Sequence, residues 1–153
     1  MAGIFLDNTL MEELNSSVQK EDIINPTQFF IGFLNTIEGW KTRCKNLHWA
    51  APKKNIHDYL DKFLKILSDY QDSIAEDYQG TLGHMQPNAI KGTQCDCLNA
   101  LDFIREVSAK TKEFFIKIPE DVDYVGIKSE TESFIHNIKV YKYLFELTDV
   151  KPY

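Results

Sequence analysis

Residues 48–76 read HWAAPKKNIHDYLDKFLKILSDYQDSIAE, a stretch that combines two histidines and five acidic residues with regularly spaced apolar ones. The apolar residues recur every three or four positions, which is the spacing of one face of an α-helix. We therefore predict a helix over about residues 55–79, ended by Gly80 and Gly83. Its inward face is predicted to hold Ile56, Leu60, Phe63, Leu64, Leu67, Tyr70 and Ile74.

The same spacing predicts three further helices. The first follows Asn25-Pro26, where asparagine can cap a helix and proline suits its first position, and runs to about residue 49. The third spans about 94–118, and the last runs from near 123 or 127 to 147. The predicted inward residues are Phe30, Phe33, Leu34, Ile37, Trp40, Cys44 and Leu47 in the first, Leu98, Leu101, Ile104, Val107 and Phe114 in the third, and Phe134, Ile138, Tyr141, Leu144 and Phe145 in the last.

Four helices of about 20 to 25 residues predict an all-α four-helix bundle. Residues 80–93 form the longest connection, in which a short helical turn is expected around residues 87–90. A long connection between the second and third helices suits an up-up-down-down crossover topology. We expect one domain over residues 1–153, with residues 1–22 as a polar N-terminal arm.

Composition and charge exclude several classes of protein. The net charge is −6, and the lysines are scattered rather than clustered, so binding to nucleic acid is not expected. The same charge attracts divalent cations. No run of about 18 apolar residues is present, and the N-terminus does not resemble a signal peptide. Three cysteines without an export signal indicate reduced thiols in the cytoplasm.

Two of the cysteines, Cys95 and Cys97, are separated by a single aspartate. Two thiolates can bind a soft metal, but zinc usually takes four ligands, so the pair alone is a weak signal. The alternative is that both are small residues near the start of a helix.

Two histidines and three acids in the opening stretch carry the stronger signal. With His57 at 0° on the predicted helix, Asp61 lies at about 40°, Asp72 at about 60° and Glu76 at about 100°. All four side chains therefore share one quadrant. Imidazoles and carboxylates together suit iron(II), manganese or zinc. The alternative is an exposed acidic helix whose histidines are incidental.

The length of the helix separates these residues into two groups. His57 and Asp72 are about 22 Å apart along the axis, so one metal site cannot use both within a single chain. A second copy in antiparallel contact would bring His57 and Asp61 of one chain against Asp72 and Glu76 of the other. A two-fold dimer would then hold two equal sites. His48, at the end of the first helix, is expected to fold back beside His57 as a further ligand.

This pattern resembles the signature of Dps-type miniferritins. In that family a His-Trp pair ends the first helix, and His, Asp, Asp and Glu follow on the second. The corresponding residues here are His48-Trp49, His57, Asp61, Asp72 and Glu76, and Leu60, Ala75 and Leu82-Gly83 also look like the family. The resemblance covers residues 40–83; beyond them the likeness is only to a bundle of similar length.

The resemblance implies a ferritin-like fold and a ferroxidase site between subunits. His48, His57 and Asp61 would come from one chain, and Asp72 and Glu76 from its partner. It also implies a hollow shell, dodecameric in the family, that oxidises iron(II) with hydrogen peroxide or oxygen and stores the ferric product. Trp49 would lie beside the iron, where an indole can pass an electron; the alternative for Trp49 is packing at a helix end.

The chain also departs from the family. The link AAPKKNI between Trp49 and His57 is shorter than usual, which would place His57 in the first turn of its helix and draw His48 away. The family's lysine-rich N-terminal tail is missing. A ferritin-like scaffold that has lost the oxidase activity therefore remains an alternative. Classical ferritins bind iron through Glu-x-x-His within one chain, and that motif does not occur here.

Overall fold

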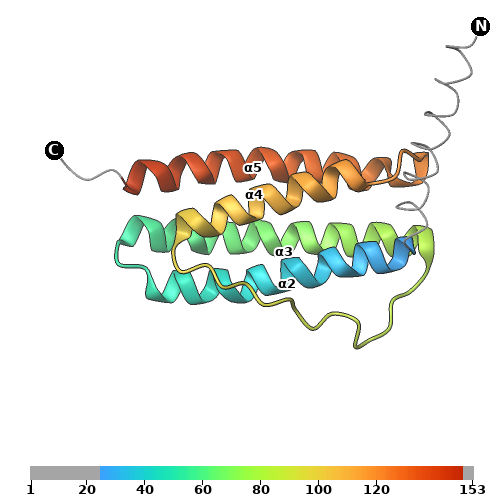
Figure 1. The fold of residues 1–153 in the computed structure, drawn as a ribbon, viewed down its shortest axis with the longest axis horizontal. Coiled ribbons are helices and arrows are strands. Elements are labelled where there is room, and N and C mark those ends of the chain that lie inside the picture. The colour runs from blue at the N-terminus through green and yellow to red at the C-terminus, as the bar shows by residue number, and fades with distance from the viewer. Residues whose placement is uncertain (1–24, 150–153) are drawn as a thin grey trace, which may run out of the picture.

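The computed structural model describes residues 25–149, so the predicted arm, residues 1–22, lies outside the described part. Within residues 25–149 four α-helices and one short 3-10 helix are present, and there are no strands (Figure 1). The predicted all-α helical bundle is confirmed. The elements are α2 (Pro26–Ala50), α3 (Lys54–Leu82), α4 (Ala100–Lys117), η1 (Val122–Tyr124) and α5 (Val125–Asp149).

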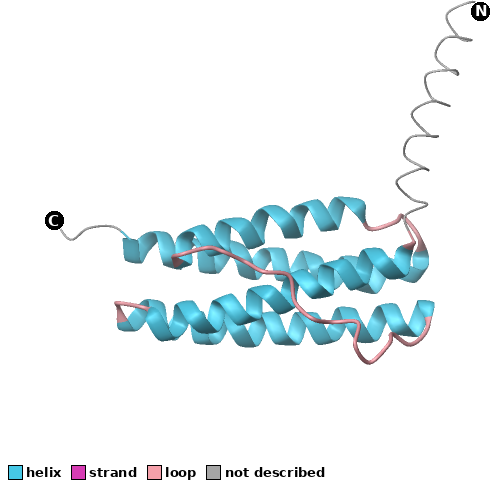
Figure 2. Cartoon of the chain, turned by 60° about the horizontal axis from the view of Figure 1, so that its bottom comes forward, coloured by secondary structure: helices cyan, strands magenta, loops and turns pink. Residues whose placement is uncertain are grey.

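The four helices pack side by side in two antiparallel pairs (Figure 1). A link of three residues, 51–53, joins α2 to α3, and a short turn with η1 joins α4 to α5. Between the pairs, residues 83–99 run back along the bundle and cross over α2 (Figure 2). Because of this return, α4 runs in the same direction as α3, and α5 packs against both. The predicted up-up-down-down order is therefore wrong: the short link makes α2 and α3 antiparallel, and the order is up-down-down-up.

The first two helices begin and end close to their predicted limits. Asn25 caps α2, since its side-chain oxygen accepts a hydrogen bond from the Thr27 backbone N–H at 3.0 Å, and proline occupies the first turn. Helix α3 extends to Leu82, slightly beyond the predicted end. It stops at Gly83, whose φ of 98° lies in the left-handed region that glycine adopts most readily.

The predicted inward faces of α2 and α3 form much of the core. All seven inward residues of α2 are buried, and Ile56 and Leu64 are the only half-buried members of the α3 set. Aromatic rings join the two pairs of helices: Phe33 of α2 stacks on Phe114 of α4 with centroids 3.8 Å apart. Such a pair contributes about 0.5–1.5 kcal/mol beyond its buried area.

The predicted start of the third helix is wrong. Helix α4 begins at Ala100 rather than near residue 94, capped by Asn99, whose side-chain oxygen accepts from the Asp102 N–H at 2.8 Å. The residues before Asn99 pair with α2 instead; the Thr93 N–H donates to the Asn35 carbonyl at 2.8 Å. Leu98, predicted to face inward, is consequently 86% exposed.

Two smaller expectations are also corrected. The segment around Pro87 forms a β-turn, closed by the Ala89 N–H and the Gln86 carbonyl at 3.1 Å, and not a turn of helix. Helix α5 begins at Val125, between the two predicted starts, because η1 directly precedes it.

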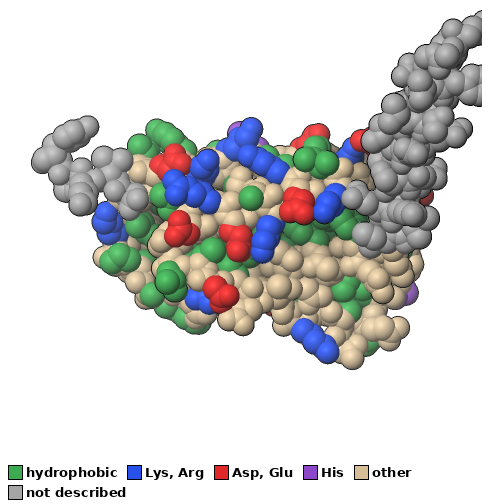
Figure 3. Space-filling model, viewed as in Figure 1, with side chains coloured by type: hydrophobic (Ala, Val, Ile, Leu, Met, Phe, Trp, Pro, Cys, Tyr) green, Lys and Arg blue, Asp and Glu red, His purple; other side chains and the backbone are tan. Residues whose placement is uncertain are grey.

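The surface carries charges of both signs. On the face shown in Figure 3, basic and acidic side chains are interspersed with exposed apolar ones. None of the helices in residues 25–149 is long and apolar enough to span a membrane.

Candidate functional site

The end of α2 and the start of α3 bring His48 and His57 together. The two imidazole rings stack with centroids 3.7 Å apart and an interplanar angle of 23°, and both residues are half-buried. The short link places His57 in the first turn of α3, as expected, and the two rings are in contact across it. The role of either ring as a metal ligand remains a prediction.

Each histidine also bonds to the backbone of the other. His48 Nδ1 lies 2.7 Å from the His57 carbonyl oxygen, and His57 Nδ1 lies 2.7 Å from the His48 carbonyl oxygen. A carbonyl oxygen can only accept, so both Nδ1 atoms carry hydrogen and donate. In the neutral rings both Nε2 atoms then keep a free lone pair, which is the arrangement of most metal-binding histidines.

The same hydrogen bonds have a structural effect. The His48 carbonyl belongs to the last turn of α2, where carbonyls have no partner within the helix. It accepts from His57 Nδ1 at 2.7 Å and more weakly from the Ala51 N–H at 3.5 Å. The histidine pair therefore closes the turn between α2 and α3 in addition to presenting two Nε2 atoms.

The three predicted acidic ligands, Asp61, Asp72 and Glu76, are exposed on α3. Within one chain, the structure does not bring all three acids together with the histidines. Within residues 25–149, one group of three or more metal-ligating side chains has its ligand atoms within 4.8 Å of one another, and it contains none of these residues. This agrees with their separation along the helix, since His57 and Asp72 are about 22 Å apart in any helix.

Trp49 follows His48 at the end of α2 and is 71% exposed. The alternative in which its indole packs at the helix end within this chain is therefore wrong.

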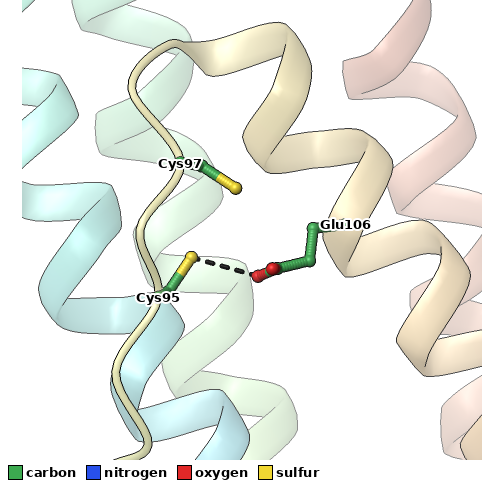
Figure 4. Close-up of side chains that lie close together, drawn as sticks. All are labelled: Cys95, Cys97 and Glu106. Atoms are coloured by element: carbon green, nitrogen blue, oxygen red, sulfur yellow. Dashed lines mark hydrogen bonds between the residues drawn. The ribbon is translucent and has the colours of Figure 1, made fainter.

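The three side chains whose ligand atoms do lie within 4.8 Å of one another are Cys95, Cys97 and Glu106 (Figure 4). The Cys95 thiol donates to Glu106 Oε2 at 3.0 Å, and the indole N–H of Trp40 donates to the same oxygen at 3.2 Å. Sequence reasoning identified the two cysteines but missed Glu106. It stands nine residues beyond Cys97, and only the path of the segment that leads into α4 brings it near the thiols.

Burial keeps the thiols of this group protonated. It raises the pKa of Cys95 to about 12 and also raises the pKa of Cys97; the Glu106 carboxylate adds to both effects. The third cysteine, Cys44, is fully buried in the core, and its thiol donates to the Leu60 carbonyl at 3.3 Å. Burial, with a smaller effect from the charge of Asp61, raises the pKa of Cys44 to about 12.

Comparison with protein-family models, with curated proteins and with solved structures gives no match to this chain.

Proposed function

We propose that this protein binds and oxidises iron(II) as a miniferritin-like oligomer, with sites formed between two copies of the chain. The observation that carries the proposal is the histidine pair. His48 and His57 each use Nδ1 for a backbone carbonyl, which leaves two Nε2 atoms at one end of α3. Carboxylates that could complete the ligand set lie on the same exposed side of α3, toward its other end.

The spacing along α3 supports a two-fold arrangement. His57 and Asp61 are four residues apart, and so are Asp72 and Glu76, so the pairs 57/76 and 61/72 share one midpoint, between Ile66 and Leu67. If two copies of α3 cross antiparallel at this midpoint, His57 comes opposite Glu76 while Asp61 comes opposite Asp72. A single two-fold axis would then form both metal sites of the dimer.

The donor set suits iron(II) as a substrate. Imidazole and carboxylate are ligands for iron, and exposed carboxylates can take up a divalent ion without first giving up buried partners. Asp61, Asp72 and Glu76 are all exposed in the single chain. Each hydrogen peroxide molecule takes one electron from each of two iron(II) ions and, with two protons, becomes two water molecules. Trp49, which follows His48, is the side chain that could pass an electron at this position.

The path of the chain is compatible with a ferritin-like bundle. Such bundles join two antiparallel helix pairs by one long crossover. Here residues 83–99 form that connection between α3 and α4. We propose further that the dimers assemble into a closed shell, twelve-membered in the miniferritins, within the cytoplasm. The net charge of −6 favours cations inside such a shell and disfavours nucleic acid as a partner.

The first test is the mass of the purified full-length protein in solution. The proposed site does not exist in a monomer, so we expect a dimer or a larger even-numbered assembly by light scattering or native mass spectrometry. A protein that remains monomeric at micromolar concentration would overturn the proposal.

The second test is iron oxidation itself. Iron(II) and peroxide are added to the protein, and the absorbance of ferric products is followed against a buffer control. We expect Asp72→Ala combined with Glu76→Ala to remove the protein-dependent rate. The matched control combines Glu113→Ala with Glu132→Ala, two exposed acids on α4 and α5, and should keep it. Equal rates in the two double variants would refute the proposed site.

A second candidate function is a structural oligomer without turnover. The observation in its favour is that the histidine pair already has a structural role, because it closes the turn between α2 and α3. An oligomer that forms normally but leaves the iron oxidation rate at the buffer level would support this alternative.

A further inference from the structure

The segment that leads into α4 is held against α2 by hydrogen bonds to one side chain. Asn35 accepts from the backbone N–H groups of Lys91 at 2.8 Å and Gly92 at 3.0 Å, both through its Oδ1. Its Nδ2 donates to the Ala89 carbonyl at 3.1 Å. A half-buried asparagine thereby satisfies three backbone groups of the connection and fixes its position on α2.

One and two turns further along α2, Gly39 and Arg43 continue this attachment. A Cβ atom on Gly39 would lie 1.6 Å from the Thr93 carbonyl oxygen, so the segment touches the helix backbone at a point where only glycine fits. Arg43 Nε then donates to the Cys95 carbonyl at 2.6 Å. These contacts set the position of Cys95, whose side chain is buried.

Glu106 approaches the thiols from α4. Its Oε2 accepts from Trp40 Nε1 at 3.2 Å and from the Cys95 thiol at 3.0 Å, while its Oε1 lies 3.6 Å from Lys110 Nζ. The Trp40 indole and Lys110 thereby hold the carboxylate in place. Figure 4 shows it pointing toward the two cysteines.

We propose that Cys95, Cys97 and Glu106 bind one thiophilic divalent cation of the zinc class. The two sulfur atoms and a carboxylate oxygen lie within 4.8 Å of one another. In a tetrahedral zinc site with Zn–S distances of about 2.3 Å, the ligand atoms are about 3.5–4 Å apart. Cys97 is half-buried and can make the small movement that closes this difference. Two thiolates and one carboxylate leave a fourth position for water.

The charges around the three ligands favour this occupant. Binding of the ion releases the two thiol protons to solvent; the resulting two thiolates and the carboxylate carry three negative charges, and a divalent cation leaves one. Arg43, bonded to the Cys95 carbonyl, and Lys110, paired with Glu106, bring positive charge beside the group. Thiolate ligands select soft ions such as zinc over magnesium and calcium, which prefer oxygen.

The position of the site gives the ion a structural effect. Cys95 and Cys97 belong to the end of the 83–99 connection, whereas Glu106 lies on α4. A bound ion would join the connection to the helix that follows it. An ion that binds only the folded chain also raises its stability by mass action. The site is complete within one chain and does not depend on the proposed iron site.

The test uses cobalt(II) as the probe, added to the reduced full-length protein. We expect a thiolate-to-cobalt charge-transfer band whose final intensity corresponds to about one thiolate-bound cobalt per chain. Cys97→Ser should remove this band, and Glu106→Gln should weaken cobalt binding at least tenfold. Cys97 is chosen over Cys95 because it is less buried. Circular dichroism is used to check that the variant is folded.

Two controls separate this site from the other donors. Cys44→Ala should keep the band, since Cys44 lies in the core and is not a member of the group. The double variant His48→Ala with His57→Ala should also keep it, because cobalt on imidazole and carboxylate gives no thiolate band. Wild-type protein without a thiolate band, or a Cys97→Ser variant that retains it, would overturn the proposal.

Discussion

The histidine pair and the thiol group both present metal-type donors, but the chain assembles them differently. His48 and His57 meet across a short link between two consecutive helices, and their position depends on local geometry. Cys95, Cys97 and Glu106 meet because a long connection is fixed to α2, a helix that contributes none of the three ligands. Substitutions near the short link should therefore disturb the histidine pair, whereas substitutions on α2 should disturb the thiol group.

The two groups also differ in completeness. His57 and Asp72 are about 22 Å apart along the same helix, so the proposed iron site needs a second chain. The thiol group is complete in one chain and partly buried. A variant that moves the connection should therefore affect the thiols alone, and one that breaks the proposed dimer should affect the proposed iron site alone.

The largest effect is expected from Gly39→Ala. The new methyl group would lie 1.6 Å from the Thr93 carbonyl oxygen, so the connection must move away from α2. We expect a loss of about 3 kcal/mol in unfolding free energy, measured by urea denaturation. Cobalt binding by the thiols should also be lost.

Gly32→Ala is the matched control for this variant. Gly32 lies on the same helix as Gly39, and a Cβ atom added to it would have no other atom within 4 Å. Alanine is the better helix former, so this variant should gain about 0.5–1 kcal/mol. If Gly39→Ala behaves like Gly32→Ala, the close contact with Thr93 is absent.

A smaller effect is expected from Asn35→Ala. The change removes three hydrogen bonds between the Asn35 side chain and the connection, which costs about 2 kcal/mol in unfolding free energy. The stacking of His48 on His57 should not change, and the imidazole signals in an NMR spectrum check this. Thr36→Ala is the control, because the Thr36 hydroxyl bonds only within α2; an equal loss in both variants would contradict the attachment.

The effect of thiol burial on stability is tested at Cys44, which belongs neither to the histidine pair nor to the thiol group. Burial raises its pKa to about 12, from 9.0 in the unfolded chain. The stabilising effect of the protonated thiol is complete below pH 9 and is lost as the pH rises from 9 toward 12. The wild-type unfolding free energy should therefore fall with pH more steeply than that of Cys44→Ala, by about 1.4 kcal/mol per pH unit. Equal slopes in reducing urea titrations would contradict this.

The histidine pair is tested by a double-mutant cycle. His48→Ala and His57→Ala each remove one hydrogen bond to the other residue's backbone and one side of the stacked pair. We expect a coupling energy of about 1 kcal/mol from thermal or urea unfolding. Strictly additive losses would show that the rings do not interact in solution.

The smallest effect is expected at Leu98. Its side chain is 86% exposed, so Leu98→Ser should change the unfolding free energy by less than about 0.5 kcal/mol. Ile104→Ala, on the buried face of α4, should cost about 3 kcal/mol in the same measurement. A large loss at Leu98 would mean that α4 begins earlier than Ala100.

The helical periodicity predicted most of the fold because each helix buries one apolar face. The inward residues of α2 are buried as expected, and Asn25 caps that helix. Periodicity failed at 94–99, where Leu98 continued the apparent pattern of the third helix. Backbone groups before Asn99 pair with Asn35 and Arg43 of α2, and this tertiary pairing outweighs local helical preference.

For the proposed iron site, helical periodicity alone sets the angles and spacing of His57, Asp61, Asp72 and Glu76, because residues on one helix keep a fixed angle and rise whatever surrounds them. The same spacing showed that His57 and Asp72 cannot share an ion within one chain. The stacking of His48 on His57 and the approach of Glu106 to Cys95 and Cys97 depend instead on tertiary packing. Those contacts depend on how the link 51–53 and the connection 83–99 pack against the helices, and local sequence patterns do not predict such packing.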